Sequence, residues 1–247
     1  MAAAAAPGSG ARKWALDLSR GSDAARRRSE KGERAEDGAL RMVPAAVLKK
    51  YRMKRDTGKG LRELWLTGQD IGVLSRQIGA LCNLRTLGLA NNRLAALPDT
   101  LFQLERLERL VLSGNQISAL PDSVKNLASL QELRLDRNRL RAFPDAIFSL
   151  RRLRHLSATD NCLEVLPPGL KRLRLLSTLE LDGNESLTDS TVEAVSWAEL
   201  SKCLQVVGLA RTGLTKAPPG LLALPELDLV RLPHKVLQLH ALRELEK

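Results

Sequence analysis

Charged side chains of both signs are grouped in the middle of this sequence. Within residues 109–160 the bases are Arg109, Arg134, Arg137 and His155, and the acids are Glu132, Asp136 and Asp160. A cluster of mixed sign suits a charged, specific protein partner better than a polyanion such as DNA, which favours a continuous basic stripe. The alternative is that these groups neutralise one another across neighbouring strands, where exposed pairs contribute little stability.

The same region gives little support for catalysis. His155 lies near Ser157 and Asp160 in the chain, but no nucleophile, base and orienting group share a strained turn or pocket. His234 and His240 are six residues apart and have no nearby thiol or carboxylate that could complete a metal site, so metal binding is not expected. We therefore predict a protein that is not an enzyme and that has no metal, cofactor or small-molecule substrate.

The number and spacing of the cysteines indicate the cellular compartment of the protein. Cys82, Cys162 and Cys203 are too few and too scattered for a disulfide framework or a zinc site. We therefore predict an intracellular, cytoplasmic protein, with the nucleus as the alternative. No membrane span is expected, because no run approaches 18 apolar residues. N-myristoylation is not expected because Ala2 follows Met1, and the opening lacks the apolar stretch of a signal peptide.

The net charge of +11 is concentrated at the N-terminal end. Residues 1–60 hold 15 Lys and Arg against 7 Asp and Glu, whereas the remainder holds 24 against 21. Residues 49–59, KKYRMKRDTGK, form a dense basic run that reads as a solvated loop. The alternatives are a nuclear-import patch or contact of residues 12–59 with nucleic acid or an acidic membrane.

A repeat of 23 residues must position the central charges. Three successive segments read LRTLGLANNRLAALPDTLFQLER, LERLVLSGNQISALPDSVKNLAS and LQELRLDRNRLRAFPDAIFSLRR, over 84–106, 107–129 and 130–152. Self-similarity at a fixed period of this size marks a stacked array. The shared pattern, LxxLxLxxNxLxxLPxxLxxL, resembles the intracellular leucine-rich repeat proteins of the Ras-group type, which include Ras-scaffold members.

This resemblance implies an α/β leucine-rich repeat solenoid of about seven to eight repeats. A curved parallel sheet would line the concave face, with loops, 3-10 turns and short helices on the convex face. Members of this group look like protein-interaction scaffolds that act on small GTPases, phosphatases or kinases, which is an analogy at the level of the fold. We place the repeats at 61–83, 84–106, 107–129, 130–152, 153–175, 176–203 and 204–226.

Side chains at fixed places in each unit have structural roles. The leucines of LxxLxL would form the buried edge of a strand. The asparagines at the ninth place would form a hydrogen-bonded ladder through the stack. The prolines would begin the return leg, by which we mean the part of each unit that leads from the end of its strand back to the start of the next. These residues are Asn92, Asn115, Asn138, Asn161 and Asn184, with Pro98, Pro121, Pro144 and Pro167.

The pattern is disturbed on both sides of the regular units. Residues 1–12 read as a disordered tail, and 13–60 as a degenerate capping repeat in which 14–19 and 40–47 flank a charged insertion. The alternative for 13–60 is a tail with coincidental Leu and Pro. The unit 176–203 has 28 residues, and the spacing of Ser190 and Glu193 predicts a capped short helix there. Residues 227–247 read as a partial repeat and C-terminal cap.

Function is expected at the third, fifth, seventh and eighth places of each unit, which face the concave surface and are free to vary because they do not pack the core. Trp65 stands out there, since Trp and Arg are favoured at interface hot spots; its alternative role is packing against the N-terminal segment. We predict a non-enzymatic adaptor that binds a protein through this face. The predicted contact residues are Trp65, Arg109, Arg134, Asp136, Arg137, His155 and Asp160.

Two further functions stay open from the sequence. The protein could be a structural subunit of a large intracellular assembly, held by its basic N-terminal quarter and its convex side. It could also associate with nucleic acid or an acidic membrane through residues 12–59, and such binding should weaken steeply as salt is raised.

Overall fold

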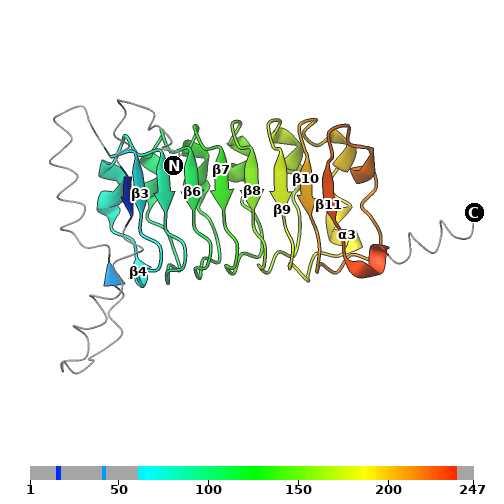
Figure 1. Cartoon of the computed structure of the whole chain (residues 1–247), viewed down its shortest axis with the longest axis horizontal. Coiled ribbons are helices and arrows are strands. Elements are labelled where there is room, and N and C mark those ends of the chain that lie inside the picture. The colour runs from blue at the N-terminus through cyan, green and yellow to red at the C-terminus, as the bar shows by residue number, and fades with distance from the viewer. Residues whose placement is uncertain (1–14, 18–40, 43–60, 238–247) are drawn as a thin grey trace, which may run out of the picture.

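The protein is built around one nine-stranded parallel sheet, in the order β1-β3-β5-β6-β7-β8-β9-β10-β11. The structure is a computed structural model that describes residues 15–17, 41–42 and 61–237. Figure 1 shows the strands side by side in a single row along the longest axis, with short helical segments behind them. The predicted repeat architecture, with one parallel sheet backed by 3-10 turns, is confirmed.

Each strand of this sheet has three residues and comes from one unit. From β3 onward neighbouring strands are offset by 23 residues, as in the pairing of Thr86 with Arg109, and the offset rises to 28 between Thr178 and Val206. The pair β1 and β3 is offset by 48 residues, as Ala15 pairs with Glu63. The strands are β1 (Ala15–Asp17), β3 (Glu63–Trp65), β5 (Thr86–Gly88), β6 (Arg109–Val111), β7 (Glu132–Arg134), β8 (His155–Ser157), β9 (Thr178–Glu180), β10 (Val206–Gly208) and β11 (Leu229–Arg231).

The return leg of nearly every unit contains a short 3-10 helix. The four predicted prolines lie at the N-caps of successive 3-10 helices, with φ between −75° and −68° as the pyrrolidine ring requires. Behind them Leu101, Val124, Ile147 and Leu170 are buried, as expected. The 3-10 helices are η3 (Arg76–Ala80), η4 (Asp99–Gln103), η5 (Asp122–Asn126), η6 (Asp145–Ser149), η7 (Pro168–Arg172), η8 (Trp197–Glu199) and η9 (Leu221–Ala223).

The asparagine ladder is present and joins each unit to the one before it. The Asn138 amide donates to the carbonyl oxygens of Leu112 and Leu135 at 3.0 and 2.9 Å, and its Oδ1 accepts the backbone N–H of Ile117 at 3.0 Å. The same three bonds recur at Asn92, Asn115, Asn161 and Asn184. In the unit 204–226 Thr212 keeps only the local part of this pattern, donating to Leu209 O at 2.7 Å.

Aromatic side chains contribute more to the core than their 3% share of the composition suggests. Phe102, Phe143 and Phe148 are all buried on the return legs, and Trp197 is 1% exposed. The ring of Phe148 lies over Gly169 of the next unit, where a Cβ atom would come within 2.5 Å of it. Aromatic rings therefore share the core with the aliphatic side chains on the return legs.

The long unit 176–203 contains the predicted helix, but its predicted cap was wrong. Helix α3 (Asp189–Val192) starts after Thr188, whose side chain forms a reciprocal capping box with Thr191. The helix therefore begins before the Ser190 cap inferred from spacing, because Thr188 is the residue with extended backbone at this point. After α3 the enlarged segment of this unit reaches Trp197, whose Nε1 donates a hydrogen bond to Val192 O at 3.2 Å.

At the two ends of the array the structure describes only part of the predicted caps. β1 pairs with β3, and β2 (Arg41–Met42) pairs with β4 (Ile71–Val73) in a second, two-stranded sheet. The remainder of 13–60, the tail 1–12 and the basic run 49–59 lie outside the described residues, so their assignment stays a prediction. The same holds for 238–247, which follows β11 and a helical turn at 234–237.

Replacing Asn138 with alanine should destabilise the protein by about 1–3 kcal/mol or more, because the change leaves two carbonyl groups and one N–H without their partner inside the stack. Asn126→Ala is the matched control, since Asn126 is exposed at the end of η5. The measurement is urea unfolding followed by circular dichroism. Equal free energies of unfolding for the two variants would contradict the ladder.

Asp189, the first residue of α3, links this helix to the following unit by hydrogen bonds. Its carboxylate accepts hydrogen bonds from Thr215 N at 3.0 Å, from Thr215 Oγ1, and from Lys216 N at 3.4 Å. Burial alone would raise the pKa of Asp189, but the hydrogen bonds from Thr215 and Lys216, with the charge of Lys216, outweigh it and lower this pKa below 3.8. The ionised form is thus the one that the folded state prefers.

The stabilisation from Asp189 should therefore depend on pH. Because its pKa is lower folded than unfolded, the contribution is complete above the ordinary pKa of 3.8 and is lost as pH falls through the lower, folded value. Asp189→Ala should reduce the melting temperature at neutral pH, and the difference from the parent should shrink below the ordinary pKa. A difference that grows on acidification would contradict this assignment.

Candidate protein-binding face

The candidate site is the sheet face, which we define as the third, fifth, seventh and eighth places of every unit. Among the predicted contact residues, Arg109, Arg134, Arg137 and His155 are exposed there. Trp65, Asp136 and Asp160 are half-buried. The strands β6, β7 and β8 bring Arg109, Glu132 and His155 to one hollow of about 320 Å³ at the edge of this face. The structure thus collects most of the predicted charges on adjacent strands, and leaves Trp65 two strands away from Arg109.

Trp65 lies flat across the neighbouring strand. A Cβ atom on Gly88 of β5 would collide with the Trp65 ring, so the indole occupies the space that a side chain at Gly88 would need. Its ring therefore leans toward the regular array. Asp17 of β1 is the backbone register partner of Trp65, so the alternative of packing against the N-terminal segment stays open. The result is a low, apolar patch that continues to the half-buried Val111 on β6.

Glu132 joins two of the predicted arginines. Its Oε2 pairs with Arg109 Nε at 2.5 Å and its Oε1 pairs with Arg134 Nε at 2.6 Å. The Glu132 side chain is only 10% exposed, while those of Arg109 and Arg134 are 50% and 56% exposed. Both carboxylate oxygens are therefore occupied within the protein, and the guanidinium groups remain accessible at the surface.

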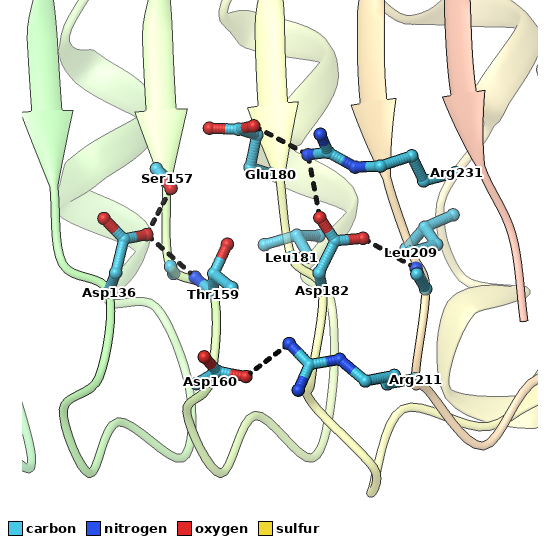
Figure 2. Close-up of polar contacts among 12 residues, drawn as sticks. Asp136, Ser157, Thr159, Asp160, Glu180, Leu181, Asp182, Leu209, Arg211 and Arg231 are labelled. Carbon is cyan, nitrogen blue, oxygen red and sulfur yellow. Dashed lines mark hydrogen bonds and ion pairs between the residues drawn. The ribbon is translucent and has the colours of Figure 1, made fainter.

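Asp136 is held by groups from both neighbouring units, and Figure 2 shows its contacts with Ser157 and Thr159 of the following unit. It accepts hydrogen bonds from Ser113 Oγ at 2.9 Å, from Ser157 Oγ, and from the backbone N–H of Thr159 at 3.0 Å. Asp182 has the same place two units later and accepts the N–H of Ala210 at 2.7 Å. An aspartate at the seventh place thus satisfies a backbone donor of the next unit, which makes Asp136 a structural group as well as a surface one.

Two ion pairs cross a whole unit and were not anticipated from the sequence. Asp160 pairs with Arg211 at 2.8 Å across Gly183, and Glu180 pairs with Arg231 at 2.6 Å across Gly208 (Figure 2). Each pair joins residues 51 apart in the chain. The sequence does contain a signal for both pairs. At one place of the repeat, a unit with glycine lies between a unit with an acid and a unit with a base; this is the eighth place for Gly183 and the fifth place for Gly208.

Arg231 is the most strongly held cation of the face. The hydrogen bond from its guanidinium to Glu180 raises the pKa of Arg231, burial opposes this, and the charges of Asp182 and Glu180 add to the rise. Its Nη2 lies 2.6 Å from Glu180 Oε1 and 2.7 Å from Asp182 Oδ2. Arg231 therefore bridges two carboxylates at the C-terminal end of the sheet.

The eighth place is not free to vary, contrary to the prediction. Every occupant in the seven units has a left-handed backbone, with φ between +50° and +74°. Four of these positions are non-glycine residues, which adopt this conformation at a steric cost. The occupants are Gly68, Asn91, Gly114, Arg137, Asp160, Gly183 and Arg211. Arg137 is exposed at such a turn and forms no ion pair with the described residues.

In the part of the chain that the structure describes, no group of three His, Cys, Asp or Glu side chains is placed to hold a metal ion. None of its helices has the length and apolar character needed to cross a membrane. Cys82, Cys162 and Cys203 are all unpaired and exposed.

Comparison with known proteins agrees with this geometry. The leucine rich repeat family profile matches residues 82–140 and 129–185. The fold is a leucine-rich repeat solenoid. A leucine-rich repeat protein of Leptospira interrogans is similar at 27% identity and a TM-score of 0.54, over 68% of this chain and 48% of that one. An internalin from Listeria monocytogenes is similar at 21% identity and a TM-score of 0.57, over 69% and 54%.

These similarities concern the repeat and its fold. This chain spans about half the length of both solved structures. No curated protein sequence matches it. Leucine-rich repeat proteins generally act in protein–protein interaction, because their stacked units create an extended surface for binding. They are typically not enzymes. The Ras-group type and the intracellular location stay hypotheses.

A double-mutant cycle tests whether Glu132 orders the sheet face. For Arg109→Ala and Glu132→Ala we expect a coupling energy of about 0.5–1 kcal/mol, because the carboxylate is nearly buried. The control cycle uses Arg141 and Glu164, which are 3.9 Å apart and mostly exposed, and should give about zero. Equal coupling in the two cycles, measured by urea unfolding, would show that Glu132 has no special role.

Proposed function

We propose that this protein is a non-enzymatic interaction module that binds one protein partner through the sheet face. The observation that supports this most directly is the combination of Trp65, lying flat over Gly88, with arginines already fixed by Glu132 on the same sheet. Side chains that are ordered before binding lose less conformational entropy when a partner arrives. Trp and Arg are also the residue types that dominate interface energetics.

The two halves of the face would make different contacts. Around Trp65, Gly88 and Val111 the surface is flat and partly apolar, which suits an apolar patch on the partner. Arg109 and Arg134 pair with Glu132 through Nε, and their half-exposed guanidinium groups can donate to acceptors on the partner through Nη. Because most acids of the face are already paired, the partner should present carboxylates and carbonyl groups and not cations.

We further propose that the partner belongs to intracellular signalling by small GTPases, phosphatases or kinases. This part rests on the resemblance of residues 61–226 to repeats of the Ras-group type, and on the absence of a cysteine framework in the sequence.

Affinity purification with quantitative mass spectrometry tests the proposed face. Trp65→Ala and the pair Arg134→Ala with Arg137→Ala should each reduce recovery of the partner by about tenfold or more, while melting temperatures stay close to the parent. The matched control is Arg76→Ala with Lys125→Ala, which removes the same charge from the exposed side of η3 and η5. Unchanged recovery with both sheet-face variants would rule out this surface.

A further inference from the structure

A second candidate binding surface lies away from the sheet face, at the edge where return legs lead into β8, β9 and β10. It is a cleft of about 660 Å³. We call it the basic cleft and define it by its charged lining, Arg151, Lys171, Arg172, Arg174, Lys202 and Glu199. Three successive units contribute to it, so the cleft exists only in the folded stack.

The walls of the basic cleft are tied together by polar contacts. Arg151 Nη1 donates to the carbonyl oxygen of Arg172 at 3.0 Å, and Ser201 Oγ donates to that of Arg174 at 2.8 Å. Lys171 Nζ pairs with Glu199 at 2.9 Å. The Glu199 side of the cleft comes from the extended return leg of the 28-residue unit, which Trp197 anchors in the core. The 28-residue unit thus forms one side of the basic cleft.

The charge of the cleft is not neutralised within the described residues. Five cations face one carboxylate, and only Lys171 is paired with it. This differs from the sheet face, where nearly every acid and most bases have an ion-pair or hydrogen-bond partner. At the repeat place of Arg151 and Arg174 the other 23-residue units carry Cys82, Glu105, Ala128 and Pro225. At that place a base is confined to the units 130–152 and 153–175.

We propose that the basic cleft binds a phosphorylated segment of a partner protein. Clustered arginines recognise phosphoryl groups through paired N–H donors, and a phosphoserine carries a charge of about −1.5 to −2 at neutral pH. The volume exceeds that of a phosphoryl group alone and accommodates flanking peptide residues. No aromatic side chain lines the cleft, so the base stacking that single-stranded nucleic acids use is missing. This inference does not depend on the sheet face.

Fluorescence anisotropy with the full chain tests the proposal. The probe is a fluorescein-labelled degenerate peptide library with a fixed central phosphoserine, and the reference is the same library with serine. We expect the phosphorylated library to bind about tenfold more tightly or better, and Arg172→Glu with Arg174→Glu to abolish that preference. Both side chains are exposed and form no ion pair with the residues that the structure describes. Arg172→Gln with Arg174→Gln gives a milder variant that should show the same direction.

The matched control is Arg76→Glu with Lys125→Glu, which makes the same change of net charge on η3 and η5. It should keep the phosphoserine preference. Equal loss in the control would show that only overall charge matters, and would overturn the proposal. Tighter binding of single-stranded RNA or of phosphoinositide-containing vesicles, lost in the Arg172 and Arg174 variants, would also overturn it by assigning the cleft to another ligand. Equal binding of the two libraries would do the same.

Discussion

The asparagine ladder is the interaction on which the rest of this structure depends. Each ladder amide satisfies a carbonyl group of its own unit, a carbonyl group of the preceding unit and an N–H of that preceding unit, all within the core. Since buried polar groups without partners are costly, the asparagine of each unit between residues 84 and 203 fixes how that unit stacks on the turn before it. The spacing of the strands and the direction of their side chains follow from that requirement.

The sheet face is consequently a set of rows with one residue per unit, and its side chains interact along those rows. Large or charged side chains reach across a glycine, as Trp65 does over Gly88 and Asp160 does over Gly183 toward Arg211. Most charged side chains of the sheet face are paired with one another before any partner binds, either across a glycine or between adjacent strands. The surface is ordered in advance, which favours specific recognition by few groups over a diffuse electrostatic attraction.

The 28-residue unit shows how the array can change locally without losing its register. Asn184 keeps the ladder contacts with the preceding unit, β9 and β10 still pair in parallel, and the five additional residues are accommodated on the return leg. There Thr188, Trp197 and Asp189 hold the extra chain against its neighbours. The added segment forms one side of the basic cleft, which makes this departure from the repeat the origin of a second surface.

The amino-acid sequence by itself determined the stacked units, their register, and the roles of Leu87, Asn138 and Pro144, because each of these roles recurs with the 23-residue period. It also identified Trp65 and the arginines of β6 and β7 as surface residues. Only the tertiary structure decided that Glu132 bridges two arginines, that Arg211 and Arg231 take part, and that positive φ constrains Arg137. The physical reason is that these contacts depend on side-chain reach between strands and on the space left by neighbouring glycines, which a linear pattern does not specify.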